Sequence, residues 1–113
     1  MLDNSMTEIP HQPHYCRPII EADWLAILRI QSQVYYDFRP ESEAVMRSKA
    51  DRGQSTCFVT LDNKPSVVAY CLAYPYPADR TAALDTVDPL PISPTDNIFV
   101  HDLAVQKASA GRG

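Results

Sequence analysis

The sequence predicts a mixed α/β domain, and three segments of the chain lead to this prediction. Residues 20–36 carry apolar side chains at helical spacing, which is typical of an amphipathic helix on a core. Residues 56–61 are rich in β-branched and aromatic side chains and predict a strand. Residues 67–74 (VVAYCLAY) are apolar at nearly every position, so we expect a strand buried on both faces, with helices on both sides of the sheet.

The size and composition of the chain fit one domain. Its 113 residues suit a single domain that buries a core, and a hydrophobic content of 45% argues against global disorder. The formal net charge of −4 gives no support to nucleic-acid binding, because phosphate-binding modules usually carry a basic face. No signal peptide is visible, and no apolar run approaches the ~20 residues of a membrane helix. We therefore expect a cytoplasmic protein that binds neither membrane nor nucleic acid.

The chain opens with a polar tail and a short strand. Residues 1–12 show no alternating pattern, and we expect a disordered N-terminal tail before a domain over residues 13–113. Residues 14–17 predict a first strand that Pro18 ends, because proline has no N–H group for a sheet ladder.

Two helices are predicted after this strand. The first covers residues 20–36, where a mostly apolar stripe is formed by Trp24, Ile27, Leu28, Gln31, Val34 and Tyr35. The second runs from Pro40 to about Arg52. Pro40 suits a first helical position, and Gly53 suits a C-terminal cap.

A hairpin, a long loop and a last strand complete the predicted elements. A turn cluster at residues 62–65 joins the two strands of the hairpin. Residues 75–96 hold half of the ten prolines, and their aspartates outnumber the single arginine. We expect an irregular loop there, which is either an acidic lip for a cationic substrate or a solvated loop. Residues 97–105 predict the last strand.

Cysteine and histidine spacing gives no support to a disulfide framework or a metal site. Cys16, Cys57 and Cys71 form an odd, widely spaced set without a CxxC pair, which favours a reducing compartment. His11, His14 and Cys16 lie close together, but no distant pair of ligands completes a zinc site. We therefore expect no metal, and we interpret Cys57 and Cys71 as inert core thiols.

The closing segment carries the most informative pattern. The strand over residues 97–105 is followed by a short linker and Gly111-Arg112-Gly113. Glycines let a backbone approach a ligand closely, and consecutive N–H groups form an anion site for phosphates. The pattern matches neither the dinucleotide fingerprint nor the Walker loop, and by itself it also fits a simple helix-entry turn.

The order of these elements, together with Leu103-Ala104-Val105 and Ala110-Gly111-Arg112-Gly113, resembles the GNAT superfamily of N-acetyltransferases. In that family a hydrophobic strand with a central bulge is followed by a short linker and Arg/Gln-x-x-Gly-x-Gly/Ala opening a helix. Tyr15-Cys16-Arg17-Pro18 resembles the opening strand of the family, and Glu21-Ala22-Asp23-Trp24 resembles its helix entry. The resemblance implies the N-terminal part of a GNAT-like acyl-CoA N-acyltransferase fold, with a mainly antiparallel central sheet flanked by helices.

The resemblance also implies a reaction, the transfer of an acetyl group from acetyl-CoA to an amine of a small molecule or a peptide. It assigns the acetyl-CoA contacts to Leu103, Ala104, Val105, Ala110, Gly111, Arg112 and Gly113. A backbone N–H group at the bulge would polarise the thioester carbonyl. Asp102 is the candidate base, unless it only hydrogen-bonds the backbone or caps a neighbouring element. In a regular strand His101 would point to the opposite face, packed beside the sheet.

Two departures from the family pattern change what is expected of this chain. Ala110 replaces the usual Arg or Gln, and the family pattern continues beyond Gly113, which lies within its pyrophosphate loop. We therefore expect this chain alone to bind acetyl-CoA poorly and to be inactive. Two alternatives are a non-catalytic remnant and a small interaction module whose acidic loop, residues 75–96, binds a basic partner. The acceptor amine, the general acid and the oligomeric state stay open.

Overall fold

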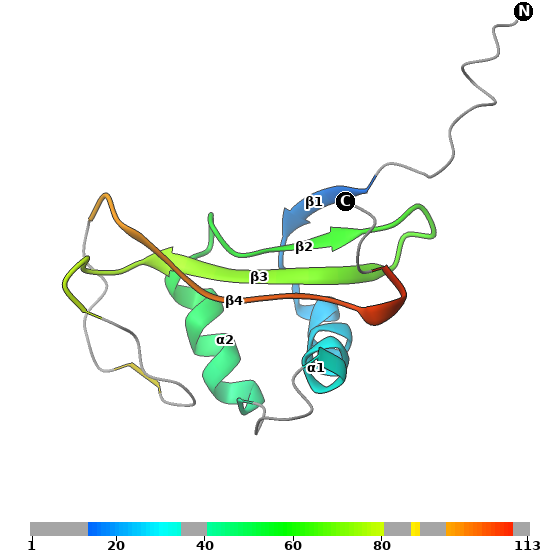
Figure 1. Ribbon diagram of the computed structural model, residues 1–113, viewed down its shortest axis with the longest axis horizontal. Helices are drawn as coiled ribbons and strands as arrows, with labels where there is room; N and C mark the ends of the chain where they lie inside the picture. Colours follow the sequence, from blue (N-terminus) through cyan, green and yellow to red (C-terminus); the bar gives the residue numbers. More distant parts are fainter. Residues whose placement is uncertain (1–13, 35–40, 81–86, 89–94, 110–113) are drawn as a thin grey trace, which may run out of the picture.

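A computed structural model describes residues 14–34, 41–80, 87–88 and 95–109 of the chain (Figure 1). Its elements in chain order are β1 (Tyr15–Pro18), the 3-10 turn η2 (Glu21–Asp23), α1 (Trp24–Val34), α2 (Glu43–Arg52), β2 (Phe58–Leu61), β3 (Val67–Pro75), β4 (Ile98–Val105) and the 3-10 turn η3 (Lys107–Ser109). The predicted mixed α/β fold with an antiparallel sheet is confirmed. None of the described helices is long and apolar enough to cross a membrane. The tail predicted over residues 1–12 lies outside the described residues.

Four antiparallel strands form one sheet in the order β1-β2-β3-β4. Figure 1 shows α1 and α2 against the same face of this sheet, and both helices contact β3. The prediction of helices on both sides is therefore wrong for the described part of the chain. β3 is nevertheless buried on both faces, because the side chains that it turns away from the helices are small. One of them, Cys71, is flanked by its register partners Phe58 on β2 and Leu103 on β4.

The first helical segment begins with η2 because Asp23 caps its entrance. The Asp23 carboxylate accepts hydrogen bonds from the Ile20 N–H at 2.8 Å and from two nitrogens of Arg17 at 2.7 and 2.9 Å. The apolar stripe predicted for this helix is confirmed within the described residues, since the buried or core-packed positions are Trp24, Ile27, Leu28, Ile30, Gln31 and Val34. Tyr35, the last predicted member of the stripe, lies outside the described residues.

The second helix begins later than Pro40, at Glu43. Ser42 is its N-cap, because the Ser42 hydroxyl accepts a hydrogen bond from the Val45 N–H at 3.3 Å. The predicted cap at the other end is confirmed: Gly53 follows the helix and donates its N–H to the Ala50 carbonyl at 3.1 Å.

The hairpin of β2 and β3 closes on an aspartate turn. The Asp62 carboxylate accepts hydrogen bonds from the Lys64 N–H at 3.0 Å and from the Ser66 N–H at 2.7 Å. This pattern is the local side-chain bonding that makes aspartate common in turns. The predicted turn cluster is therefore confirmed, and it aligns the two strands that carry most of the core.

The core lies between the sheet and the two helices. Its buried members are Trp24, Ile27, Ile30, Met46, Cys57, Val59, Leu61, Tyr70, Leu72 and Ala104. Cys57 and Cys71 are both buried, and burial raises the pKa of the Cys57 thiol to about 11 and also raises that of Cys71. Both are buried thiols kept in the protonated form, as predicted; Cys57 lies in this core, whereas Cys71 is buried on the other face of the sheet.

Candidate functional site

The pairing of β3 with β4 is interrupted by a bulge in β4. Leu72 pairs with Asp102 and Ala73 pairs with Val100, so that His101 is an extra residue between them. The side chain of His101 is 1% exposed and Asp102 is 8% exposed, whereas Val100 is 59% exposed. The bulge therefore turns the two titratable side chains toward the same face, that of the helices. Their opposite orientation, predicted for a regular strand, does not apply here because of the inserted residue.

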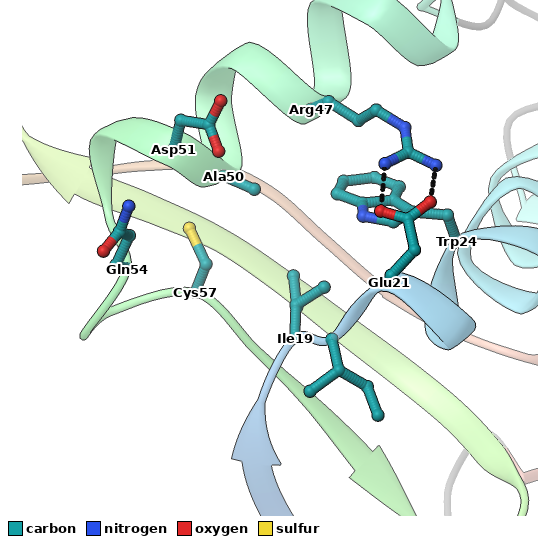
Figure 2. A pocket seen from close by; sticks show the side chains of 9 residues that line it. Ile19, Glu21, Trp24, Arg47, Ala50, Asp51, Gln54 and Cys57 are labelled. Carbon is teal, nitrogen blue, oxygen red and sulfur yellow. Dashed lines mark hydrogen bonds and ion pairs between the residues drawn. The ribbon is translucent and has the colours of Figure 1, made fainter.

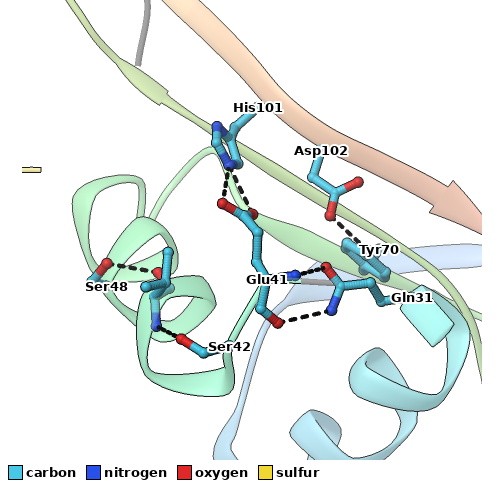
Figure 3. Close-up of polar contacts among 8 residues, drawn as sticks. Gln31, Glu41, Ser42, Ser48, Tyr70, His101 and Asp102 are labelled. Carbon is cyan, nitrogen blue, oxygen red and sulfur yellow. Dashed lines mark hydrogen bonds and ion pairs between the residues drawn. The ribbon is translucent and has the colours of Figure 1, made fainter. Parts of the chain in front are cut away.

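On the helix side of the bulge, His101 is held by Glu41. The Nε2 atom of His101 lies 2.9 and 3.1 Å from the two carboxylate oxygens of Glu41 (Figure 3). The backbone of Glu41 is fixed in turn by Gln31 of α1, whose side-chain amide donates to the Glu41 carbonyl at 3.2 Å and accepts from the Glu41 N–H at 3.3 Å. A chain of contacts thus runs from α1 through the start of the α2 segment to the bulge.

Asp102 is held by a second contact beside the first. The Tyr70 hydroxyl on β3 donates a hydrogen bond to the Asp102 carboxylate at 2.7 Å (Figure 3). Asp102 therefore bonds a side chain of the adjacent strand. Both residues are buried, so this contact orients the carboxylate within the helix face of the sheet.

Two further titratable residues lie on the same face, Lys49 of α2 and Tyr74 of β3. Both are fully buried, and the Lys49 Nζ lies 5.8 Å from the centre of the Tyr74 ring. Burial lowers the pKa of Lys49, although the negative charges of Asp88 and Glu41 act to raise it. Burial raises the pKa of Tyr74. In both residues the enclosed surroundings disfavour the charged form.

Tyr74 and Tyr76 belong to a small second core cluster with Phe99. Their rings meet edge to face, with centres 5.9 Å apart. Tyr74 is 0% exposed and Tyr76 is 5% exposed. Both rings are therefore packed in the interior of this cluster.

The opposite face of β4 is apolar and exposed. The exposed fractions are 45% for Ile98, 59% for Val100, 59% for Leu103 and 39% for Val105. Ala104, between the last two, is buried at 3% and faces the core.

The main-chain N–H and C=O groups of β4 also alternate in direction from one residue to the next. The Gln106 N–H donates to the Val68 carbonyl of β3 at 2.8 Å. Because successive residues of an antiparallel strand turn their N–H and C=O groups to opposite sides, the groups of Ala104 also turn toward β3. Those of Leu103 and Val105 then turn toward the edge of the sheet, where β4 is the last described strand.

Several sequence-predicted positions lie outside the described residues. The pyrophosphate loop predicted at Ala110, Gly111, Arg112 and Gly113 is among them. The described chain ends in η3, where the Ser109 N–H donates to the Gln106 carbonyl at 3.0 Å. The phosphate contacts of this loop therefore stay a prediction.

The acidic loop is described in part. Asp88 accepts a hydrogen bond from the Tyr76 hydroxyl, while Asp79 and Asp96 are exposed. Residues 81–86 and 89–94 lie outside the described residues, so the alternative of a basic partner at this loop stays a prediction. Among the residues that the structure describes, no group of His, Cys, Asp and Glu could hold a metal ion.

Sequence reasoning missed Glu41, Gln31 and Tyr70 as contributors to this site. Gln31 carried a usable signal, because a polar side chain inside an apolar helical stripe needs a buried partner. Tyr70 carried a similar one, as a hydroxyl within an otherwise apolar strand. Glu41 had no such signal, since a carboxylate near the start of a helix already has an explanation in the helix dipole.

The comparisons with known proteins rest on structure. No family model matches the sequence, and no curated protein matches it. A solved structure from Corynebacterium glutamicum, described as histone acetyltransferase HPA2 and related acetyltransferase, matches with a TM-score of 0.50 and 14% sequence identity. The chain has the fold of a known acetyltransferase. The match covers 87% of this chain and 63% of that one, so the chain spans less than two thirds of its length.

Proposed function

We propose that this chain is an acetyl-CoA-dependent N-acetyltransferase domain, in which β4 is the strand that receives the acetyl-CoA arm. The observation that carries the proposal is the bulge of β4 at His101, at the described edge of the sheet. The shared fold with an acetyltransferase supports it. The three free thiols, Cys16, Cys57 and Cys71, support a reducing cytoplasm as its location.

The main chain of β4 suits the pantetheine arm. An extended, amide-containing ligand adds to an exposed sheet edge by main-chain hydrogen bonds. In this proposal the arm pairs with the main chain at Val105, which turns to that edge, and it lies beside the exposed side chains of Leu103 and Val105. Ala104 supplies the spacing between them. In this proposal the loop from Ala110 to Gly113 holds the pyrophosphate through its N–H groups.

The reaction joins the amine nitrogen to the acetyl carbon and breaks the carbon–sulfur bond of the thioester. A backbone N–H group at the bulge polarises the carbonyl and stabilises the negative charge that develops on its oxygen. The attacking amine loses one proton, and we assign Asp102 as its acceptor. His101 is the weaker candidate, because its Nε2 atom is engaged by both carboxylate oxygens of Glu41.

The β4 assignment predicts where acetyl-CoA perturbs the protein in an NMR titration. We expect amide shifts centred on residues 100–105, detectable even if binding is as weak as the sequence suggests. Val105→Pro removes an edge N–H group and should abolish these shifts, whereas Val105→Ala keeps the N–H group and should retain them. Pantetheine without the nucleotide should shift the same amides. Shifts that avoid β4, or that survive in Val105→Pro, would contradict the assignment.

The role of Asp102 predicts a loss of turnover. Because the sequence predicts little or no activity for this chain alone, release of free thiol above the uncatalysed rate is sought with acetyl-CoA at high concentration and a panel of primary amines. Asp102→Asn should slow this release by about 100-fold, the usual contribution of a positioned base. Tyr70→Phe, which removes the hydroxyl that bonds Asp102, should slow it less. Equal rates in Asp102→Asn and the unaltered protein would exclude Asp102 as the base.

A further inference from the structure

A cavity lies away from β4, between α2 and the segment that joins β1 to α1 (Figure 2). Its volume is about 480 Å³, which is within the usual range for small-molecule sites. β1 and β4 are opposite edges of the described sheet, with two strands between them. The cavity is therefore separate from the bulge and from the proposed acetyl-transfer site.

Apolar side chains form one part of the cavity wall. Trp24 and Cys57 line it from the core, where they are 6% and 3% exposed, and Ile19 lines it from the segment after β1. The Cys57 thiol is engaged with the Ala73 carbonyl at 3.1 Å and is held protonated by burial. This wall offers an apolar surface to the body of a small ligand, and no reactive nucleophile.

The charged part of the wall is negative. Glu21 and Asp51 each bring a carboxylate, and Arg47 brings the opposing guanidinium. Arg47 is engaged by two carboxylates, because its two terminal nitrogens bond Glu21 at 2.7 and 2.8 Å and its Nε bonds Glu43 at 2.8 Å. The guanidinium also lies 5.0 Å from the centre of the Trp24 ring. Two carboxylates thus neutralise Arg47, and the charge of Asp51 is left to dominate the other end of the cavity.

Figure 2 shows how these groups are divided. The Arg47–Glu21 pair lies over Trp24 at one end, whereas Asp51 and Gln54 lie at the other. A ligand in this cavity meets an apolar wall and, at one end, a carboxylate together with an amide. An anion would face Asp51 at this end, while the guanidinium at the other end is already balanced by the carboxylates of Glu21 and Glu43.

We propose that this cavity is a binding site for a small organic ammonium ion with a flat apolar body. The body packs against Ile19 and the edge of Trp24, and the ammonium group lies at Asp51 and Gln54. The attraction between the ammonium group and Asp51 selects the cation over a neutral molecule of the same shape. The site is independent of the proposed acetyl transfer, so either assignment stands if the other fails.

Trp24 makes the proposal directly measurable, because it is the single tryptophan of the chain and lines the cavity. We expect 2-phenylethylammonium to change the Trp24 fluorescence saturably. The neutral isostere 2-phenylethanol should bind about tenfold more weakly, as expected for loss of a charge-assisted contact. An absence of saturable change, or equal affinity for the two probes, would overturn the proposal.

Three variants test whether the ammonium probe binds in this cavity. Asp51→Asn should weaken the binding of 2-phenylethylammonium about fivefold, as expected for loss of an ion pair near the surface. It should leave the affinity for 2-phenylethanol unchanged. Asp79→Asn removes the same charge from an exposed position on the loop after β3 and should have no effect. Leu103→Lys alters the β4 edge and should also have no effect, whereas weaker binding in that variant would assign the amine to the acetyl-transfer site. Equal effects of Asp51→Asn and Asp79→Asn would likewise overturn the proposal, and thermal unfolding checks that every variant is folded.

Discussion

Replacing Gly53 with alanine is expected to lower the free energy of unfolding by about 3 kcal/mol or more, the range of severe overpacking. A Cβ atom at Gly53 would lie 2.1 Å from the Ala73 carbonyl oxygen and 2.9 Å from the Cβ of Tyr74. Neither neighbour can yield easily, because both belong to β3 and are paired there with β4, Ala73 with Val100 and Tyr74 with Phe99. The same Cβ would lie 2.6 Å from the Thr56 hydroxyl, which donates a hydrogen bond to Ala73.

Urea unfolding measures this effect, and Gln54→Ala is the matched control. Gln54 is the exposed neighbour of Gly53, so its truncation should change the free energy of unfolding by less than about 0.5 kcal/mol. The φ angle of Gly53 is −131°, which other residues also adopt, so the close approach to β3 is the reason for glycine. A Gly53→Ala variant that unfolds at the same urea concentration as the unaltered protein would exclude this close contact.

Replacing Asp23 with alanine is expected to cost about 2 to 4 kcal/mol of stability, because it leaves buried donors without an acceptor. Asp23 is 3% exposed and accepts two hydrogen bonds from Arg17 and one from the Ile20 N–H. These contacts join β1 to the entrance of α1. Arg17 remains partly exposed, with a side-chain exposure of 31%, and water therefore compensates a share of the loss.

The contribution of Asp23 should also depend on pH. Burial alone raises the pKa of Asp23, but the hydrogen bonds from Arg17 and Ile20 outweigh burial, and the net pKa is lowered. A lowered pKa in the folded state stabilises the protein above the unfolded-state pKa of about 3.9, and this contribution disappears as the pH falls through the folded-state pKa. The stability difference between the unaltered protein and Asp23→Asn should therefore shrink from about pH 5 downward in urea titrations.

The comparison with Asp23→Asn is necessary because other carboxylates titrate in the same range. The pKa of Glu21 is lowered by Arg47, and that of Asp62 is lowered by the N–H groups of Ser66 and Lys64. Their contributions remain in both proteins and cancel in the difference. A difference that stays constant down to about pH 3 would mean that the Asp23 carboxylate contributes little as a charge.

Most elements of this fold could be predicted from the sequence because their signals are local. The spacing of Trp24 and Ile27 is sufficient for a helix, and Asp62 with its following residues is sufficient for a turn. The helix boundaries were harder to predict, because several neighbouring residues can each serve as the first residue or the cap of a helix. Pro40 was a plausible first residue, but the hydroxyl of Ser42 sets the observed start of α2.

The sequence could place the candidate residues on the last strand, but it could not give their geometry. Asp102 and His101 were identified on the last strand, yet their shared orientation depends on how β4 is aligned with β3. The contact of His101 with Glu41 joins residues that are 60 positions apart, which no local pattern can reveal. The outward face of β3 was misjudged for a similar reason, because Ala69, Cys71 and Ala73 are covered by neighbouring strands and need no helix.

The strand order has a consequence for how the polypeptide assembles. β2 and β3 are consecutive and joined by the Asp62 turn, so their contacts form at little entropic cost. β1 pairs with β2 only across the whole helical segment, since the register partners Cys16 and Thr60 are 44 positions apart. We therefore expect the β2–β3 pair to form early in folding and β1 to dock late. Changes in the Asp62 turn should mainly slow folding, whereas changes in β1 should mainly accelerate unfolding.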